Sequence, residues 1–320
     1  MSGHTRKIPV ILDGDPGHDD AIAWVMAFAQ DILDIRGVIS VSGNASLEKT
    51  TRNMLRIMTL LNVRNVPLAK GSPRPLTSKP FDAPSVHGQS GLDGPALPEP
   101  LLDLKLSSLE GVELIADLLY KSNEPITLVP TGPLTDIAAL LLSHPGLKSK
   151  ISGISLMGGG MLMGNWTPAA EFNILADPEA AKIVFESGVP IIMAGLDVTE
   201  KAYLTPPEFD RIRGIGGTVA ETVAGWLEFF YRFHREFGYP GAPVHDPVAL
   251  VALINPQILT FNDLYVQVET CGEYCRGATI GDFFNKSGQP PNARVIMNIN
   301  REAYVDMIAD AVKYYARRGL

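Results

Sequence analysis

Short apolar runs alternate with segments of helical character along most of the chain, and this alternation limits the possible folds more than any other feature. The runs are Ile8–Leu12, Ile35–Val41, Ile126–Val129, Ile151–Met157 and Pro190–Ala194. Each is short and rich in apolar residues, many of them β-branched, which is typical of a buried strand. Strands that alternate with helices form a mostly parallel, doubly wound sheet with helices on both faces. We therefore expect an α/β fold.

One α/β domain is expected to span residues 1–320. Length alone would allow about two domains, but no linker, internal repeat or low-complexity tract divides the sequence. Further strands are expected within residues 264–270 and 294–299, and a long helix rich in aromatic residues is expected over residues 218–237. Residues 71–100 are rich in proline, glycine and serine without periodicity, and a loop of that length is more often functional than idle.

The composition excludes several classes of protein. Hydrophobic residues make up 46% of the sequence and charged residues 19%, which is typical of a globular protein with a sizeable core. A net charge of −8 argues against a nucleic-acid partner, which needs a basic face. No apolar run approaches the roughly 18 residues of a membrane span, and we expect no signal peptide because only five apolar residues precede Asp13. The two cysteines, Cys271 and Cys275, are interpreted as reduced thiols, which favours a cytoplasmic protein. Because no apolar run is long enough to span a bilayer, we expect no membrane partner.

Four carboxylates follow the first strand directly. Asp13, Asp15, Asp19 and Asp20 lie around a Pro-Gly break and open a helix-forming segment. One or two acidic residues would suffice to cap that helix, whose N-terminus favours negative charge. Four close together repel one another unless a cation is present, and hard oxygen ligands favour calcium or magnesium. The sequence therefore favours a metal site here over a capped helix after a solvated turn.

Other polar or glycine-rich stretches also lie just past predicted strands. They include Asn44, Thr131 and Gly158–Gly160, in addition to the four aspartates. In doubly wound sheets ligands bind outside the carboxyl ends of the strands. We therefore expect the active site at this edge of the sheet.

Later segments offer further candidates, each with a plainer alternative. His245-Asp246 precedes a helix that begins with Pro247. Asp246 could act only as its N-cap, or it could supply a third metal-binding carboxylate with His245 as a proton donor. Asn165 and Glu171–Asn173 could fold over one ligand or form polar surface, and His87 could be a solvated loop residue.

Phe229, Phe233 and Phe237 recur at a spacing of four on the aromatic-rich helix. Such a stripe commonly packs into a core. Because it ends near His245, it could also form the wall of a pocket for a flat ring.

Taken in chain order, these segments resemble the inosine–uridine-type nucleoside hydrolases. The similarity spans residues 8–247 and is carried by DGDPGHDDA (13–21), GN (43–44), HGQSGLDGP (87–95), VPTGPLT (129–135), LMGG (156–159), GN, AEFN and ADPEAA within 164–181, and PVHDP (243–247). That family cleaves the N-glycosidic bond of ribonucleosides to give ribose and free base, and it holds calcium tightly. The resemblance therefore implies a calcium-dependent N-glycosidase, acting in nucleoside catabolism or salvage.

The resemblance also implies roles for individual residues. Asp15, Asp20, Asp246 and the main-chain carbonyl of Thr131 would hold calcium, Asp15 would also act as general base toward the attacking water, and His245 would be the acid. The remaining residues implied to bind the substrate, toward the ribose or the base, are Asp19, Asn44, His87, Met157, Asn165, Glu171, Phe172, Asn173, Phe229 and Phe233.

Several alternatives for the function stay open at this point. We expect hydrolysis with inversion at the anomeric carbon and a broad or inosine/uridine-type preference, with a pyrimidine-specific enzyme as the alternative. A non-catalytic, calcium-dependent nucleoside-binding protein and a magnesium-dependent phosphotransferase are rivals from other classes. The family tends to form homodimers or homotetramers, and the same is expected here.

Overall fold

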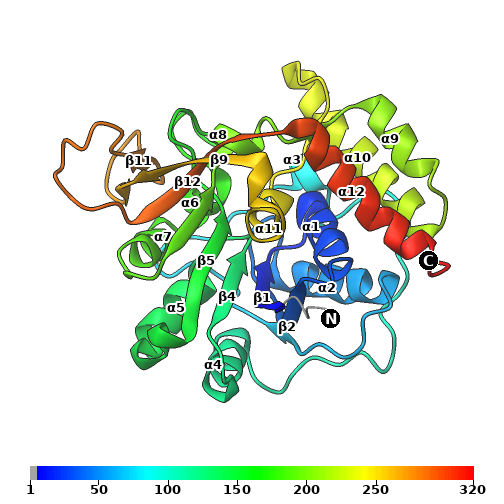
Figure 1. Cartoon of the computed structure of the whole chain (residues 1–320), viewed down its shortest axis with the longest axis horizontal. Helices are drawn as coiled ribbons and strands as arrows, with labels where there is room; N and C mark the ends of the chain where they lie inside the picture. The colour runs from blue at the N-terminus through cyan, green and yellow to red at the C-terminus, as the bar shows by residue number, and fades with distance from the viewer. Residues whose placement is uncertain (1–5) are drawn as a thin grey trace, which may run out of the picture.

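An eight-stranded sheet forms the centre of the molecule in the computed structural model, which describes residues 6–320 (Figure 1). All neighbouring strands are parallel except the last pair, β12 and β9, so the predicted mostly parallel α/β fold is confirmed. In spatial order the strands are β3 (Leu68–Lys70), β2 (Leu33–Ser40), β1 (Ile8–Gly14), β4 (Ile126–Pro130), β5 (Ile151–Met157), β6 (Ile191–Ala194), β12 (Ala293–Ile299) and β9 (Leu259–Leu264).

Helices cover both faces of this sheet because alternate side chains of each strand point to opposite faces. Val10 and Leu12 belong to one buried cluster, whereas Ile11 between them belongs to the other. The first face is covered by α1 (His18–Phe28), α2 (Leu47–Leu60), α11 (Pro247–Ile254) and α12 (Arg301–Ala316). The second is covered by α4 (Gly111–Lys121), α5 (Thr135–Ser143) and α7 (Pro178–Phe185).

Shorter elements and one long helix complete the fold. The long helix α10 (Thr218–His234) packs on α9 (Pro206–Arg213) and α12, and the three lie together in Figure 1. The short elements are α3 (Pro84–His87), α6 (Phe172–Ala176), α8 (Leu196–Thr199), β7 (Tyr203–Leu204), β8 (Ala242–Pro243), β10 (Val266–Val268), β11 (Thr279–Gly281), and the 3₁₀ turns η1 (Pro145–Lys150), η2 (Arg235–Phe237) and η3 (Pro256–Ile258).

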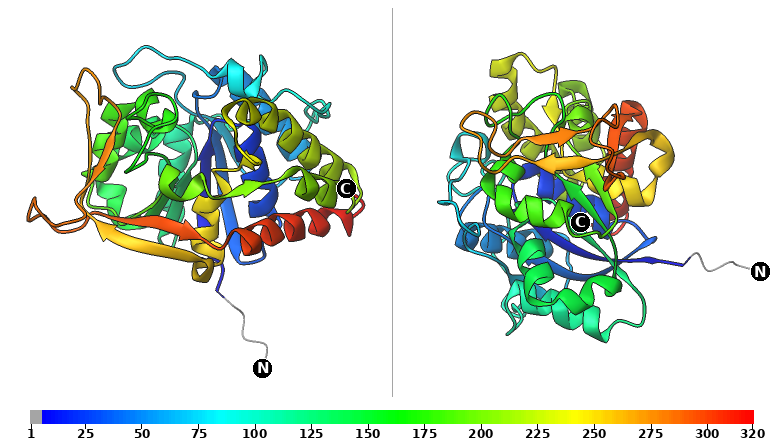
Figure 2. Two further views of the ribbon diagram at one scale, coloured as in Figure 1. Left: turned by 90° about the horizontal axis from the view of Figure 1, so that it is seen from above. Right: turned by 90° about the vertical axis from the view of Figure 1, so that its left-hand side faces the viewer.

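The chain between β9 and β12 departs from the central sheet. It forms the antiparallel pair β10–β11 and projects from one end of the molecule, drawn in orange in Figures 1 and 2. The strand expected within residues 264–270 is therefore β10, outside the main sheet. Strand β9 was not predicted, because an exposed antiparallel edge strand such as Leu259–Leu264 keeps several polar residues.

Two other predictions from the sequence concern the long loop and the N-terminus. The long loop contains the short helix α3, which carries His87. The stretch searched for a signal peptide includes residues 1–5, which lie outside the described part of the chain. In residues 6–320 we find no helix with both the length and the apolar character that crossing a membrane would require.

One buried hydrogen bond ties α12 to the segment that leads into α11. The fully buried Tyr304 hydroxyl donates to the Val244 carbonyl over 2.6 Å, immediately before His245 and Asp246. Replacing Tyr304 by phenylalanine leaves that carbonyl unpaired, so we predict that Tyr304→Phe lowers the free energy of unfolding by about 1–2 kcal/mol. Urea unfolding measures this change.

The matched control is Tyr120→Phe, because the Tyr120 side chain is 76% exposed. The control is expected to leave the unfolding midpoint unchanged. Equal midpoints for both variants would show that the Tyr304 hydrogen bond contributes nothing to stability.

Candidate active site at the carboxyl edge of the sheet

The ends of β1 and β4 and the start of α11 bring acidic side chains together. Asp15 lies in the turn after β1, while Asp19 and Asp20 form the first turn of α1. Asp246 is the N-cap residue of α11 and is buried, as are the other three. Asp19, Asp20 and Asp246 each present one carboxylate oxygen, and these oxygens lie within 4.8 Å of one another.

Asp15 lies against the same cluster. One of its carboxylate oxygens accepts a hydrogen bond from the protein, and the other accepts none from the described residues. The Asn44 backbone N–H donates to Asp15 Oδ2 over 2.7 Å, whereas Oδ1 is buried and has no hydrogen-bond partner among the described residues. Glycines pack closely over this carboxylate: a Cβ on Gly43 would lie 2.0 Å from Oδ2, and one on Gly132 would lie 2.8 Å from Oδ1. The chain therefore leaves room for Asp15 only because both positions lack side chains.

Burial and mutual repulsion raise the pKa of every carboxyl group in the cluster. The pKa of Asp15 rises well above its usual value through burial and the nearby Asp20, and that of Asp246 rises through burial and the charges of Asp19, Asp20 and Asp15. Burial raises the pKa of Asp19 to about 8 and that of Asp20 to about 6. Removing the protons at neutral pH is therefore costly unless a positive charge balances them.

The donor set fits a hard divalent cation. It consists of carboxylate oxygens, one of them an orphaned buried atom, and the Thr131 main chain beside them. The Thr131 hydroxyl donates to Asp20 Oδ1 over 2.6 Å, and this places residue 131 next to the cluster. Such oxygen-only sites suit calcium or magnesium.

Asp13 lies on the α5 side of the sheet, although Asp20 is close enough to help raise its pKa. Both of its carboxylate oxygens are buried without a hydrogen-bond partner in residues 6–320, and its pKa is raised by burial and then by Asp136 on α5. The sequence grouped Asp13 with the other three acidic residues of the turn, but the strand alternation directs its side chain toward α5.

One end of the adjoining cavity is a polar wall formed around α6. Glu171 caps this helix: its carboxylate accepts backbone hydrogen bonds from Gly159 (2.8 Å), Asn173 (2.8 Å) and Ile174 (3.1 Å). The Asn173 side chain donates to the Thr131 carbonyl over 2.8 Å, and Asn165 Oδ1 accepts from the backbone of Phe172. Asn165, Glu171 and Asn173 therefore lie close together around the start of α6.

A histidine-rich wall lies at the other end. His245 is buried, and its Nδ1 lies 2.8 Å from the Thr199 hydroxyl. Burial lowers the pKa of His245 to about 4, so its ring is neutral at neutral pH. His87 on α3 is also buried and stacks on Phe230, with ring centroids 5.3 Å apart.

The cavity between these walls has a volume of about 330 Å³. It is lined by most of the predicted site residues, namely Asp19, Asn44, His87, Thr131, Met157, Asn165, Glu171, Phe172, Asn173, Phe233, His245 and Asp246. Asp15 and Asp20 are fully buried beneath it.

Phe229 differs from the prediction. It is absent from the cavity lining and stacks on His18 instead, with ring centroids 5.0 Å apart, and Phe230 lines the cavity in its place. A spacing of four identifies one face of a helix but does not fix which neighbouring face meets the ligand.

The sequence reasoning also missed Glu200, His234 and Tyr239, which line the cavity near His245. His234 lies four residues after Phe230 on the same helix face, so it could have been found only together with Phe230, which the sequence analysis also missed. Glu200 and Tyr239 carry no motif that would have singled them out.

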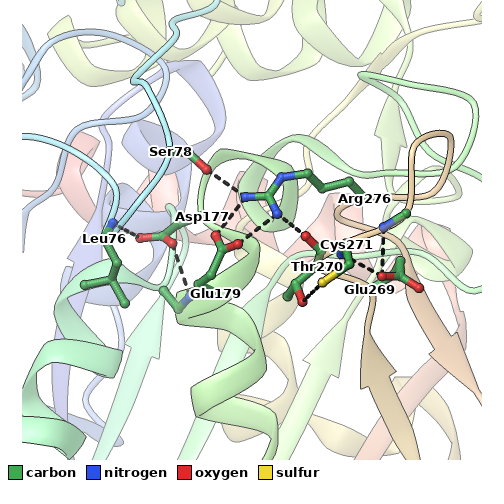
Figure 3. A network of polar contacts seen from close by, with 10 residues as sticks. Leu76, Ser78, Asp177, Glu179, Glu269, Thr270, Cys271 and Arg276 are labelled. Carbon is green, nitrogen blue, oxygen red and sulfur yellow. Dashed lines mark hydrogen bonds and ion pairs between the residues drawn. The ribbon is translucent and has the colours of Figure 1, made fainter.

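Side-chain contacts hold the loop that leads to His87 (Figure 3). The Leu76 amide donates to Asp177 Oδ2 over 2.8 Å, and Arg276 donates to Ser78 Oγ and to Glu179, each over 2.8 Å. Arg276 comes from the projecting β10–β11 segment, and the two acids come from the start of α7. Three distant parts of the chain are therefore tied together at this loop.

Comparison with known proteins gives consistent matches over nearly the whole chain. The family model described as inosine-uridine preferring nucleoside hydrolase matches residues 10–306. Pyrimidine-specific ribonucleoside hydrolases RihA from Escherichia coli O6:H1 and from Shigella flexneri are each 50% identical over 311 residues, covering 97% of this chain and 99% of theirs.

Solved structures share the fold. A purine-preferring ribonucleoside hydrolase from Gardnerella vaginalis superposes with a TM-score of 0.90 at 30% identity, over 97% of this chain and 99% of that one. The plant nucleoside hydrolase PpNRh1 gives a TM-score of 0.88 at 28% identity, over 96% and 99%.

The raised carboxyl pKa values predict how pH and cations act on stability. Between the usual pKa near 4 and the raised values, the folded state binds more protons than the unfolded state, so the free energy of unfolding falls as pH rises. In chelator the protein is therefore expected to be less stable at about pH 8 than at about pH 5. Calcium at a hundredfold excess over its Kd should restore about 3 kcal/mol, mainly at the higher pH.

Urea unfolding at both pH values, with chelator or with calcium or magnesium, measures these effects. Asp246→Asn removes one of the repelling charges, so it should weaken both the pH dependence and the cation effect; the exposed control Asp31→Asn should change neither. A parent protein with equal calcium stabilisation at both pH values would contradict the assignment.

Proposed function

The chain belongs to the inosine-uridine preferring nucleoside hydrolase family, and from this premise we propose that it is a pyrimidine-specific ribonucleoside hydrolase. The observation that carries the proposal is the 50% identity, over 97% of the chain, to enzymes described as pyrimidine-specific. The purine-preferring relative is only 30% identical. This favours the pyrimidine alternative over the broad or inosine/uridine-type preference expected from the sequence. Family membership also favours a hydrolase over the phosphotransferase and the non-catalytic binder.

In this proposal Asp15, Asp20, Asp246 and the Thr131 carbonyl hold a calcium ion. The open Oδ1 of Asp15 and the repulsion among the buried carboxylates support that assignment. When bound, such an ion orients ribose hydroxyls and lowers the pKa of the attacking water. Asp19 and Asn44 contact the ribose from the α1 side of the cavity, and Asn165, Glu171 and Asn173 contact it from the α6 side.

Asp15 serves as the general base in this scheme. As a ligand of the ion, its carboxylate would lie beside the water that the ion holds and would take that water's proton. Departure of the base leaves positive charge on the sugar, which the buried carboxylates stabilise. Attack from the face opposite the leaving base inverts the anomeric carbon.

His245 assists the departure of the base, and its neutral ring can do so by donating a hydrogen bond to the leaving nitrogen. If the Thr199 hydroxyl donates to Nδ1, the single ring proton lies on Nε2. Because burial keeps His245 neutral at neutral pH, its Nε2–H donates a hydrogen bond that stabilises the negative charge on the leaving base, and the proton stays on the ring. His87, Phe230 and Phe233 flank the base, with Met157 and Phe172 completing the substrate contacts.

A panel of nucleosides assayed for released base tests the proposed function. Uridine and cytidine should be hydrolysed with kcat/KM at least about tenfold higher than inosine, adenosine or guanosine, a difference of about 1.4 kcal/mol. Chelator should abolish all of the activity and added calcium should restore it. Inosine cleaved as well as uridine would contradict pyrimidine specificity, and activity that persists in chelator would contradict the cation.

The role of His245 predicts a dependence on the leaving group. His245→Ala should lower kcat for uridine by about a hundredfold or more, whereas p-nitrophenyl riboside, whose leaving group needs no proton, should be little affected. Steady-state kinetics on both substrates measures the difference. Equal losses on the two substrates would contradict this role toward the leaving base and would point to a structural effect instead.

A further inference from the structure

The end of the cavity beyond His245 contains three polar side chains that the hydrolytic scheme does not use. Glu200 follows α8, His234 ends α10 and Tyr239 follows η2, and all three line the cavity. The His234 ring lies 6.5 Å from His245 and 5.3 Å from Tyr239, measured between centroids. Since His245 adjoins the acidic cluster through Asp246, this group lies on the side of the cavity where the base must lie.

His234 presents an acceptor to the cavity. Its Nδ1–H donates to the Phe230 carbonyl over 2.9 Å. Burial lowers the pKa of His234 to about 4, so the ring holds one proton at neutral pH and Nε2 carries a lone pair. Nε2 has no protein partner in the described residues, and a ligand can therefore supply the donor.

Glu200 presents a second acceptor. Its pKa is raised by burial, and the hydrogen bond from the Tyr239 hydroxyl and the nearby His234 offset part of that rise. The pKa of Tyr239 is raised well above its usual value by burial and by Glu200, so the hydroxyl stays protonated and can donate to the carboxylate. No lysine or arginine lines this cavity in the described part of the chain, so no cation of the protein neutralises Glu200 there.

Two acceptors from different elements are complementary to a ligand edge that carries N–H donors. The 4-amino group of cytosine carries two N–H bonds on one nitrogen. Uracil carries a carbonyl oxygen at that position, which a carboxylate and an imidazole lone pair would both repel. We infer that Glu200 is a specificity-determining residue that, together with His234, accepts the 4-amino group of cytidine and favours cytidine over uridine. This inference rests on the proposed pyrimidine specificity.

The test compares kcat/KM for cytidine and uridine in the parent enzyme and in Glu200→Gln. Glutamine keeps the size of the side chain but replaces one acceptor by an amide donor that can serve the uracil carbonyl. We expect the cytidine-to-uridine ratio to fall by roughly tenfold, the worth of one hydrogen bond to a charged acceptor. The matched control is Glu186→Gln, an exposed position at the C-terminal end of α7 outside the cavity lining, which should leave the ratio unchanged.

Two further substrates separate this inference from a loss of folding and from the proposed function. p-Nitrophenyl riboside, which has no base edge, should be cleaved equally by the parent and by Glu200→Gln. An unchanged cytidine-to-uridine ratio in an active Glu200→Gln enzyme would overturn the role of Glu200 and leave the hydrolase function intact. A parent enzyme that prefers inosine to both pyrimidine nucleosides would overturn the proposed specificity and this inference with it.

Discussion

Repulsion among four buried carboxylates is the constraint on which the rest of this structure depends. Asp15, Asp19, Asp20 and Asp246 lie together with almost no access to solvent, and burial raises the pKa of each. Such an arrangement is unfavourable by itself, and the surrounding fold must hold it in place until a cation balances the charge. Hydrogen bonds from the Thr131 hydroxyl to Asp20 and from the Asn44 backbone to Asp15 help to hold these carboxylates in place.

The parallel sheet brings these carboxylates to one place. Strands β1 and β4 are neighbours, so the turns that follow them meet at one edge although more than a hundred residues separate them in sequence. Asp246 reaches the same edge from the start of α11, which Tyr304 on α12 ties down through the carbonyl of Val244. The acidic cluster therefore depends on long-range packing, and no single segment could assemble it.

The sequence predicted those parts of the molecule that a local pattern of residue types explains by itself. Buried strands, the carboxylates of the first turn and the His245-Asp246 pair are of this kind. Whether Phe229 or Phe230 faces the ligand depends on the rotation of α10, which packing against α9 and α12 sets. Asp13 looked like a fourth member of the cluster, yet its strand directs it toward Asp136. Glu200 and β9 could not be predicted, because neither carries a local pattern.

The two ends of the cavity obey different constraints. At the α6 end the Glu171 carboxylate accepts three backbone N–H groups, so its position is fixed by the chain itself and a substitution there would disturb the helix start. At the other end Glu200 and His234 keep acceptors that the protein leaves open. Changes at these two positions can alter which base is bound without touching the carboxylates that hold the charge, because the acceptors share no hydrogen bond with the cluster. Base preference can therefore diverge within a common scaffold, which is how a chain of this fold can resemble both pyrimidine-specific and purine-preferring enzymes.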